Sequence, residues 1–429
     1  MTGFCMHHFA YKNGTLHAEG VSLENIAAEV GTPVYVYASA TIERHYQAFA
    51  GAFEGMRARV FYAMKANSNL AVLRLLGSLG AGADTVSEGE VRKALAAGIP
   101  ASRIVLSGVG KSDEELAFAV SSGLYQINIE TEGELHALSK VAAGLGKRQS
   151  AVIRINPDVG AGGHAKITTG SAENKFGVSL AEVERLYALA QTLPGVAMEG
   201  LAMHIGSQIR ALGDLSAACG RMRALVLRLR AQGHAVNRVD LGGGLGIPYE
   251  MAEAVVHGSD LIEAYAAMVK HTFEALDVEL GFEPGRIIVG NAGILLSRVL
   301  QLNTRPAKTF AIVDAAMNDL IRPAMYGAYH DIWTVNEETK GESRKAYDVV
   351  GPICETGDTF CEQRSLPPLK LGDLIAFMTA GAYGAVMSST YNSRRLVPEV
   401  LVKGEQMAVV RPRPSYDELI GLDRMPDWL

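Results

Sequence analysis

Short apolar runs alternate with stretches of helical period from about residue 30 to about residue 290, and this alternation is the strongest constraint on the fold. Repeats of this kind are typical of a parallel sheet covered by helices. Eight runs have the composition of strands: 60–63, 83–86, 104–107, 126–129, 152–155, 199–203, 236–241 and 278–282. Helical segments lie between them at 70–79, 88–97, 113–121, 132–143, 180–191, 215–231 and 261–276. Eight consecutive units predict a closed (β/α)8 barrel, whereas a doubly wound open sheet is less favoured because no Gly-x-Gly-x-x-Gly follows the first strand.

The pattern changes after about residue 290. Runs rich in β-branched residues, separated by Gly, Pro and Asp, occupy 310–313, 346–350, 374–377 and 396–402. They predict a second, mostly antiparallel β-sandwich or β-barrel domain. The first residues contain similar short runs, which we expect to join the same sheet. The prediction is therefore a barrel domain over 33–290 and a β domain formed by 1–32 and 291–429.

Composition excludes several classes of partner. The 429-residue chain has a net charge of −6 with scattered Lys and Arg, so no basic stripe for nucleic acid is expected. No apolar run reaches membrane-spanning length and no leader pattern opens the chain, so no membrane partner is expected. The four cysteines lack both CxxC and zinc spacing, which predicts no disulfide framework and no metal site. Reduced thiols of this kind fit a cytoplasmic enzyme.

Lys65 directly follows the first predicted strand, in Val60-Phe-Tyr-Ala-Met-Lys-Ala-Asn67. A lysine at the end of a buried strand is desolvated, which favours a neutral amine able to attack an aldehyde such as that of pyridoxal phosphate. The alternative is a lysine whose ammonium simply reaches water from the strand end. The rest of the chain decides between these two interpretations.

Further polar residues recur at the carboxyl ends of the predicted strands, where barrel enzymes carry their chemistry. Asp84 ends the second strand, Arg154 the fifth and His204 the sixth, while Gly242–Gly244 follow the seventh and Glu283 the eighth. A single placement of this kind is compatible with chance. The repetition favours a site at this end of the barrel, with Lys65 as a member.

Two loops have the composition of a phosphate cradle. Gly242-Gly-Gly244 permits close approach of backbone to an anion, although many βα turns use glycine for shape alone. Barrel phosphate sites recur after strands seven and eight, and the backbone of Gly285 and Arg286 follows strand eight. Ser207 is a further candidate donor to the phosphate.

Glu283 and His204 are candidates for contact with the ring of such a cofactor. A carboxylate beside a pyridine nitrogen keeps that nitrogen protonated and makes the ring an electron sink, which suits decarboxylation better than racemisation. The imidazole of His204 has the position expected for stacking on the ring. Both residues also have a purely structural interpretation. Glu283 would then lie in a surface turn before a proline, and His204 would be a strand-end histidine whose hydrogen bonds are made within the protein.

These motifs resemble the pyridoxal-phosphate enzymes of the alanine racemase and ornithine decarboxylase fold type, and within it the diaminopimelate decarboxylase family. The similarity covers nearly the whole chain. The motifs that carry it are 62–67, 204–208, 242–244, 283–286, 322–330, 351–358 and 381–383.

The resemblance implies a barrel plus a β domain, assembled as a homodimer with active sites shared across the interface. It also implies that meso-diaminopimelate, a small amino-acid substrate, is converted to L-lysine and carbon dioxide. Lys65 would form the Schiff base, and Gly243 with the 283–286 turn would hold the cofactor. By the same resemblance, the distal carboxylate of the substrate would be bound by Arg286, Arg322 and Tyr326, and the distal ammonium by Glu355. Tyr383 would contact cofactor and substrate, and Cys354 would protonate the substrate carbon. Cys354 and Glu355 would come from the partner chain.

Two alternatives stay open at this point. A related decarboxylase would act on ornithine, arginine or carboxynorspermidine, but a distal end bearing both charges suits two arginines and a glutamate better. The second alternative is a catalytically inactive protein of the same fold. The presence of Lys65, Glu283 and Cys354 argues against it. Free cysteines are usually small buried hydrophobes, the role expected of Cys5, Cys219 and Cys361, whereas Cys354 lies in a polar turn.

One segment departs from the family pattern. The stretch 160–170 has Ala165-Lys166 where relatives usually carry an aromatic residue soon after the histidine. We expect this stretch to form a loop over the site.

Overall fold

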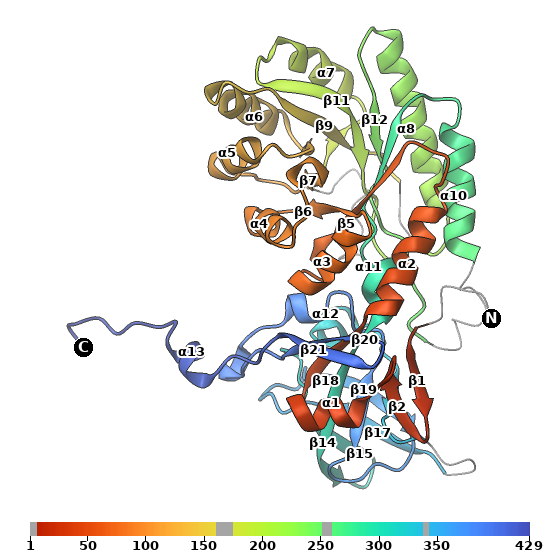
Figure 1. The fold of residues 1–429 in the computed structure, drawn as a ribbon, viewed down its shortest axis with the longest axis vertical. Coiled ribbons are helices and arrows are strands. Elements are labelled where there is room, and N and C mark those ends of the chain that lie inside the picture. Colours follow the sequence, from red (N-terminus) through yellow and green to blue (C-terminus); the bar gives the residue numbers. More distant parts are fainter. Residues whose placement is uncertain (1–6, 160–174, 251–259, 338–342) are drawn as a thin grey trace. The chain divides into compact units, whose positions relative to one another are not determined.

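The computed structural model describes residues 7–159, 175–250, 260–337 and 343–429 (Figure 1). The predicted loop 160–170 and Cys5 lie outside these residues. The described chain divides into two compact units. The first contains described residues between 43 and 247 and between 260 and 288, and the second contains 7–42, 248–250 and described residues from 289 to 429.

The first unit is a closed parallel barrel. Its eight strands are β5 (Ala58–Ala63), β6 (Gly82–Thr85), β7 (Ile104–Leu106), β8 (Gln126–Ile129), β9 (Gln149–Asn156), β11 (Val196–Met203), β12 (Arg238–Asp240) and β13 (Glu279–Phe282). They are hydrogen-bonded in the order β9-β11-β12-β13-β5-β6-β7-β8, and the pairing of β8 with β9 closes the ring. The short β10 (Val178–Ser179) pairs with β9 outside the ring. The predicted barrel is confirmed, with every predicted strand present.

Helices alternate with the barrel strands and surround them (Figure 1). They are α3 (Leu70–Ser78), α4 (Glu88–Ala96), α5 (Asp113–Ser122), α6 (Glu132–Gly144), α7 (Val183–Thr192), α8 (Gly213–Ala231) and α10 (Asp260–Phe273). Short polar residues start several of them. Asn69, Ser87 and Thr131 each accept a hydrogen bond from an N–H of the first helical turn. Such caps satisfy backbone donors that would otherwise be orphaned, so the turns after β5, β6 and β8 have a defined geometry.

The second unit is mostly antiparallel β structure, as predicted. Its main sheet contains β4 (Val34–Ala38), β14 (Gly293–Thr304), β15 (Thr309–Val313), β16 (Ile332–Thr334), β17 (Lys345–Val350), β18 (Thr359–Leu366), β19 (Leu374–Phe377), β20 (Glu399–Lys403) and β21 (Gln406–Arg411). The described helices α1 (Leu23–Val30), α12 (Arg322–Tyr326) and α13 (Tyr416–Ile420) belong to this unit. Two further helices, α2 (Ser39–Gly51) and α11 (Arg286–Val289), span the divisions between the units.

The N-terminal strands differ from the prediction. β1 (Phe9–Lys12), β2 (Thr15–Ala18) and β3 (Val21–Ser22) form a separate three-stranded sheet beside α1 (Leu23–Val30) instead of joining the main sheet. The first boundary between the domains also differs from the expected one: the N-terminal part of the second unit extends to residue 42 instead of residue 32. The reason is that β4 pairs with β14 and β20 and therefore belongs to the second unit.

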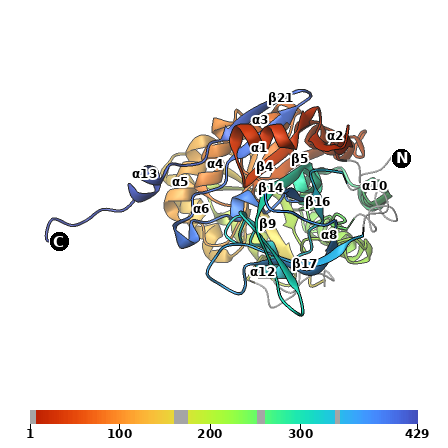
Figure 2. The same cartoon turned by 90° about the horizontal axis from the view of Figure 1, so that it is seen from below.

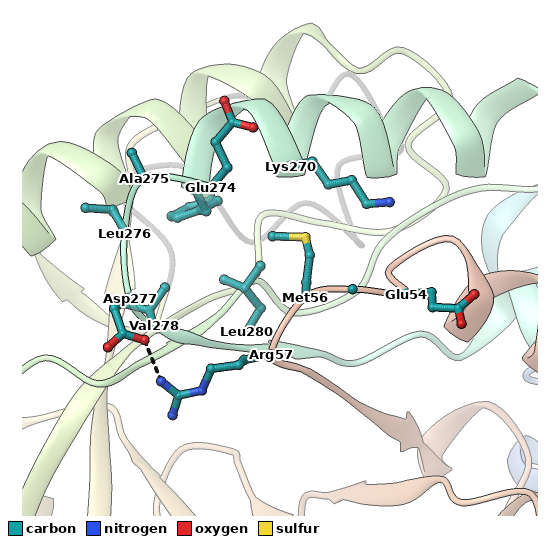
Figure 3. Close-up of a pocket in the computed structure, with 12 residues that line it drawn as sticks. Glu54, Met56, Arg57, Lys270, Glu274, Ala275, Leu276, Asp277, Val278 and Leu280 are labelled. Atoms are coloured by element: carbon teal, nitrogen blue, oxygen red, sulfur yellow. Dashed lines mark hydrogen bonds and ion pairs between the residues drawn. The ribbon is translucent and has the colours of Figure 1, made fainter.

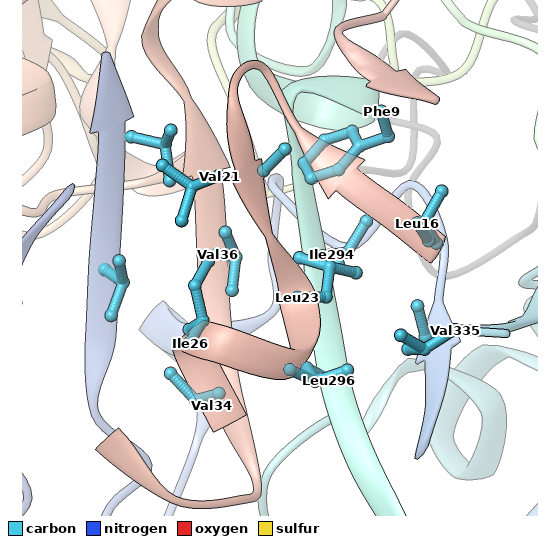
Figure 4. Packing of buried hydrophobic residues seen from close by; sticks show 14 of the residues in the cluster. Phe9, Leu16, Val21, Leu23, Ile26, Val34, Val36, Ile294, Leu296 and Val335 are labelled. Atoms are coloured by element: carbon cyan, nitrogen blue, oxygen red, sulfur yellow. The ribbon is translucent and has the colours of Figure 1, made fainter. Parts of the chain in front are cut away.

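A hydrophobic core joins the two sheets of the second unit (Figure 4). Phe9, Leu16 and Ile26 pack with Val36 and Ile294, and all are almost completely buried. Side chains alternate across a strand, so β4 and β14 each contribute every second residue to this cluster. The core explains why the N-terminal residues stay with the β unit although they do not extend its main sheet.

After β21 the chain runs outward from the second unit, with α13 part of the way along it (Figures 1 and 2). Ile420, Met425 and Trp428 are all exposed here. Among the described helices, none has the length and apolar content needed to cross a membrane.

Candidate active site

Lys65 lies in the short 3-10 turn Met64–Ala66 directly after β5. Its Nζ forms an ion pair with Oδ2 of Asp84 at 3.3 Å, and Asp84 lies near the end of the neighbouring strand β6. The Asp84 side chain is fully buried, while that of Lys65 is 37% exposed. The desolvation expected of Lys65 is therefore only partial in this structure, and its amine can be reached from solvent.

Three buried carboxyls lie at the carboxyl ends of barrel strands: Asp84 near the end of β6, Asp240 at the end of β12, and Glu283 after β13. Burial, followed by repulsion from Asp240 and Asp84, holds the pKa of Glu283 well above its usual range. Oε1 of Glu283 has no hydrogen-bond partner among the described residues. An orphaned buried carboxyl oxygen requires a donor, and the described residues do not supply one.

His204 follows β11 and connects the strand ends to the glycine loop. Its Nδ1 accepts a hydrogen bond of 3.2 Å from the N–H of Gly243. Burial, together with the nearby charges of Lys65 and Arg154, lowers the pKa of His204 well below its usual range. The imidazole is therefore neutral at physiological pH, with its proton on Nε2.

The glycine loop approaches its neighbours too closely for any side chain. A Cβ at Gly243 would lie 2.1 Å from the carbonyl oxygen of Glu283, and one at Gly244 would lie 2.4 Å from that of Gly206. Gly244 also has φ of +109°, a conformation that favours glycine. The loop after β12 thus contacts the loop after β13 backbone to backbone. Gly285 has somewhat more space, because a Cβ there would lie 3.1 Å from the side chain of Ala63.

Ser207 and Arg286 contact each other across two barrel loops. Nη2 of Arg286 donates to Oγ of Ser207 over 3.0 Å, and Arg286 is 7% exposed. A buried guanidinium beside a hydroxyl and two glycine-containing loops is suited to an anion.

Arg154 is fixed by a partner that our sequence reasoning missed. Its Nη1 lies 2.9 Å from Oε1 of Glu130, whose side chain is fully buried and also accepts from the N–H of Gly177. The guanidinium of Arg154 lies over the ring of Phe176 as well. The position of Glu130 directly after β8 was the available signal, because the other predicted site residues occupy equivalent strand ends.

Replacing Glu130 by alanine is expected to lower the free energy of unfolding of the barrel by about 3–5 kcal/mol, because it leaves a buried guanidinium without its counter-ion. Urea unfolding followed by circular dichroism measures the change. Glu132→Ala is the matched control, since Glu132 forms an exposed pair with Arg185 and its loss is expected to leave the urea midpoint unchanged. Equal midpoints for the two variants would contradict the assigned role of Glu130.

The second unit contains the five remaining predicted residues. Arg322 begins α12 and is 6% exposed. Its Nη1 lies 2.8 Å from Nε2 of His330, whose Nδ1 lies 2.8 Å from the carbonyl oxygen of Met378. A carbonyl only accepts, so Nδ1 of His330 carries the proton and Nε2 accepts from Arg322. The ring of Tyr249, 4.6 Å from the guanidinium carbon, adds a cation–π contact that orients Arg322.

Cys354 and Glu355 lie in the turn between β17 and β18, and both are exposed. Asp358 fixes this turn: its carboxylate accepts from the N–H of Ile353 at 2.7 Å and from that of Met317 at 2.6 Å. The N–H of Cys354 donates to Asn392. The thiol is therefore presented on an anchored, solvent-facing loop.

Glu355 contacts the hydroxyl of Tyr391, which raises the pKa of that phenol. Tyr326 ends α12 and is half-buried. Tyr383 has φ of +57°, a strained value for a tyrosine of the kind that clusters at functional sites. Cys219, in contrast, is fully buried in α8 as expected, and Cys361 is partly buried in β18.

A hollow of about 590 Å³ lies elsewhere in the first unit, lined by Arg57, Lys270, Glu274, Asp277 and neighbouring residues (Figure 3). Arg57 and Asp277 precede β5 and β13 and form an exposed ion pair. The hollow therefore faces the amino ends of the strands, the side of a barrel that serves stability.

The structure thus gathers one group of predicted residues at the carboxyl end of the barrel: Lys65, Asp84, Arg154, His204, Ser207, Gly243, Gly244, Glu283, Gly285 and Arg286. A second group lies in the β unit: Arg322, Tyr326, Cys354, Glu355 and Tyr383. Sequence reasoning missed Glu130 and Asp240 in the first group and His330 and Asp358 in the second. Within the described residues, no cluster of three His, Cys, Asp or Glu has the arrangement of a metal site.

Comparison with known proteins identifies relatives of nearly full length. Residues 39–290 match the pyridoxal binding domain of pyridoxal-dependent decarboxylases. Diaminopimelate decarboxylase of Pseudomonas fluorescens is 48% identical over 96% of this chain and 98% of its own, and that of Zymomonas mobilis is 43% identical over 98% and 99%.

Solved structures agree with the sequence comparison. Diaminopimelate decarboxylase from M. jannaschii in complex with L-lysine covers 99% of this chain and 100% of its own with a TM-score of 0.92 and 33% identity. The Helicobacter pylori enzyme complexed with L-lysine covers 94% and 99% with a TM-score of 0.89 and 37% identity. The chain therefore belongs to the diaminopimelate decarboxylase family of pyridoxal-dependent decarboxylases.

Proposed function

We propose that this chain decarboxylates meso-2,6-diaminopimelate to L-lysine and carbon dioxide with pyridoxal 5'-phosphate as cofactor. The observation that carries the proposal is the position of Lys65 at a strand end beside buried carboxyls, in a chain of this family. When bound, the cofactor supplies an electron sink that accepts the electron pair left behind by the departing carbon dioxide.

The residues of the barrel fit this cofactor. Lys65 has a reachable amine for covalent attachment, and the orphaned Oε1 of Glu283 suits a protonated ring nitrogen. The tight glycine loop, Ser207 and Arg286 suit the phosphate. In this structure the N–H of Gly243 donates to His204 and is not available to the phosphate. Gly243 contributes instead by having no side chain, which leaves space for an anion. Asp84, Arg154 and Gly285 complete the set assigned to the cofactor.

The residues of the β unit suit the distal end of the substrate. Arg322 is buried and oriented by His330 and Tyr249, which favours recognition of a carboxylate. We assign the distal carboxylate to Arg286, Arg322 and Tyr326, the distal ammonium to Glu355, and a contact with cofactor and substrate to Tyr383. Cys354 donates the proton that replaces carbon dioxide on the substrate carbon.

We further propose a cytoplasmic homodimer in which Cys354 and Glu355 enter the partner's site. The exposure of both residues on a turn fixed by Asp358 supports this assembly. A polar loop with a proton-donating thiol needs cover to exclude water during the reaction, and a second chain provides it.

Substrate choice tests the proposal. With pyridoxal phosphate present, carbon dioxide release from meso-diaminopimelate is expected to exceed that from L-ornithine or L-arginine by about 10²–10⁴-fold in kcat/KM, because these analogues leave a buried guanidinium without its counter-ion. Carbon dioxide is measured directly for each amino acid. Faster release from ornithine or arginine would overturn the assignment of substrate. No release from any of the three amino acids would overturn the proposal that the chain is a decarboxylase.

A further inference from the structure

Asp240 is a buried carboxyl beside Glu283 to which the proposed reaction assigns no task. It ends β12, is 2% exposed, and its Oδ1 accepts a hydrogen bond of 2.9 Å from the N–H of Gly242. Among the described residues, no N–H group donates to its other oxygen, Oδ2. A buried charged oxygen without a donor is unfavourable, so this group needs a further explanation.

The neighbouring strand makes room for Asp240. β12 pairs with β13 so that Asp240 lies opposite Gly281, and a Cβ at Gly281 would come within 2.9 Å of Cγ of Asp240. Two backbone hydrogen bonds continue this register past the strand ends: Leu241 donates to Gly281, and Glu283 donates to Gly242. Gly281 and Glu283 are two residues apart along the chain, so this register places the carboxyls of Asp240 and Glu283 beside each other, where they interact.

Two carboxylates in contact repel each other unless a proton lies between them. Lys65 forms its ion pair with Asp84, and Arg154 forms its own with Glu130, so the direct counter-ions nearby are paired to other acids. The groups that face the pair are Asp84, Lys65 and Arg154 from the ends of barrel strands and Tyr265 from α10. Burial raises the pKa of Asp240 to about 6, and that of Glu283 lies well above its usual range.

We propose that Asp240 is a positioning residue that shares one proton with Glu283 in the cofactor-free chain, and that the protonated ring nitrogen of the cofactor displaces this proton on binding. The inference rests on the proposed cofactor. The O–H bond of the shared proton breaks, the proton leaves to solvent, and the N–H of the ring takes its place as donor to Glu283. No electron transfer is involved. Before the cofactor binds, the shared proton prevents two buried negative charges from lying side by side. It also holds the carboxyl of Glu283 in the orientation in which it would accept from the ring nitrogen.

The sign of the pH dependence follows from this competition. At pH values where the shared proton is still bound, the cofactor must displace it in order to bind. The affinity of the wild type for the cofactor therefore rises with pH, by up to about tenfold per pH unit. Asp240→Asn keeps an oxygen that accepts from Gly242 but removes the shared proton and one negative charge. Its affinity is expected to depend less on pH.

Calorimetry of pyridoxal phosphate binding at pH 6, in two buffers of different ionisation enthalpy, counts the protons released. Asp240→Asn is expected to release fewer protons than the wild type, by at least about half a proton per chain. Tyr265→Phe is the matched control: it alters a buried side chain near Asp240 without removing a carboxyl, so it should release as many protons as the wild type. Equal release by Asp240→Asn and the wild type would overturn the inference.

An infrared difference spectrum of the wild type covers the case in which Asp240→Asn does not fold. Cofactor binding should remove the carbonyl band of a protonated carboxyl, and an unchanged band would overturn the shared proton. A wild type that binds no pyridoxal phosphate in either experiment would instead overturn the proposed function. The two failures are therefore distinguishable.

Discussion

Lys65→Ala is expected to abolish the visible absorption of the protein incubated with pyridoxal phosphate and to lower decarboxylation by more than about 10³-fold, a small part of the enhancement that enzymes typically provide. We propose that the amine of Lys65 is the nucleophile that attaches the cofactor covalently, and alanine offers none. The ion pair with Asp84 also disappears, which leaves a buried carboxylate without its cation. Absorbance after gel filtration, followed by the carbon dioxide assay, measures both effects.

Lys140→Ala is the matched control for this prediction. Lys140 is 77% exposed, so its loss should change neither the absorption nor the turnover. An undiminished visible band in Lys65→Ala would contradict covalent attachment at Lys65. Recovery of the Lys65→Ala protein with wild-type circular dichroism would separate the chemical effect from unfolding.

The barrel could be predicted because each strand is a local signal. A short buried run lies between a helical segment and a polar cap, as at Asn69 or Ser87, and those features depend on neighbouring residues alone. β4 could not be assigned in this way. Its apolar run resembles a barrel strand, but it pairs with β14 and β20, which lie more than 250 residues further along the chain. Only tertiary pairing decides its domain.

The candidate site shows the same limit. Residues at strand ends, such as Asp84 and Glu283, could be selected because parallel strands bring their carboxyl ends together. The partners that tune them could not. His330 orients Arg322 through a buried contact, and Asp240 meets Glu283 because Gly281 leaves the space open. Such contacts depend on side-chain packing between elements, which periodicity does not encode.

Cys354→Ala is expected to keep the visible absorption and lose turnover by about 10²–10⁴-fold, the usual range for removal of a positioned acid. The thiol lies in the β unit, whereas Lys65 lies in the barrel, so cofactor attachment is not affected directly. Cys361→Ala is the control, because Cys361 is a partly buried residue of β18 with no assigned role. Turnover of Cys354→Ala at the wild-type rate would contradict the acid role that we propose for Cys354.

Mixing the two inactive variants tests whether Cys354 acts in the partner's site. If sites are shared, a heterodimer of Lys65→Ala and Cys354→Ala contains one site with both residues intact and one with neither. Random exchange of equal amounts makes half of the dimers heterodimers, so activity should recover to about a quarter of the wild type. If Cys354 serves its own chain, every site lacks one residue and no activity returns. Mass spectrometry of the mixture confirms exchange, so that an inactive mixture of exchanged dimers would place Cys354 in the site of its own subunit.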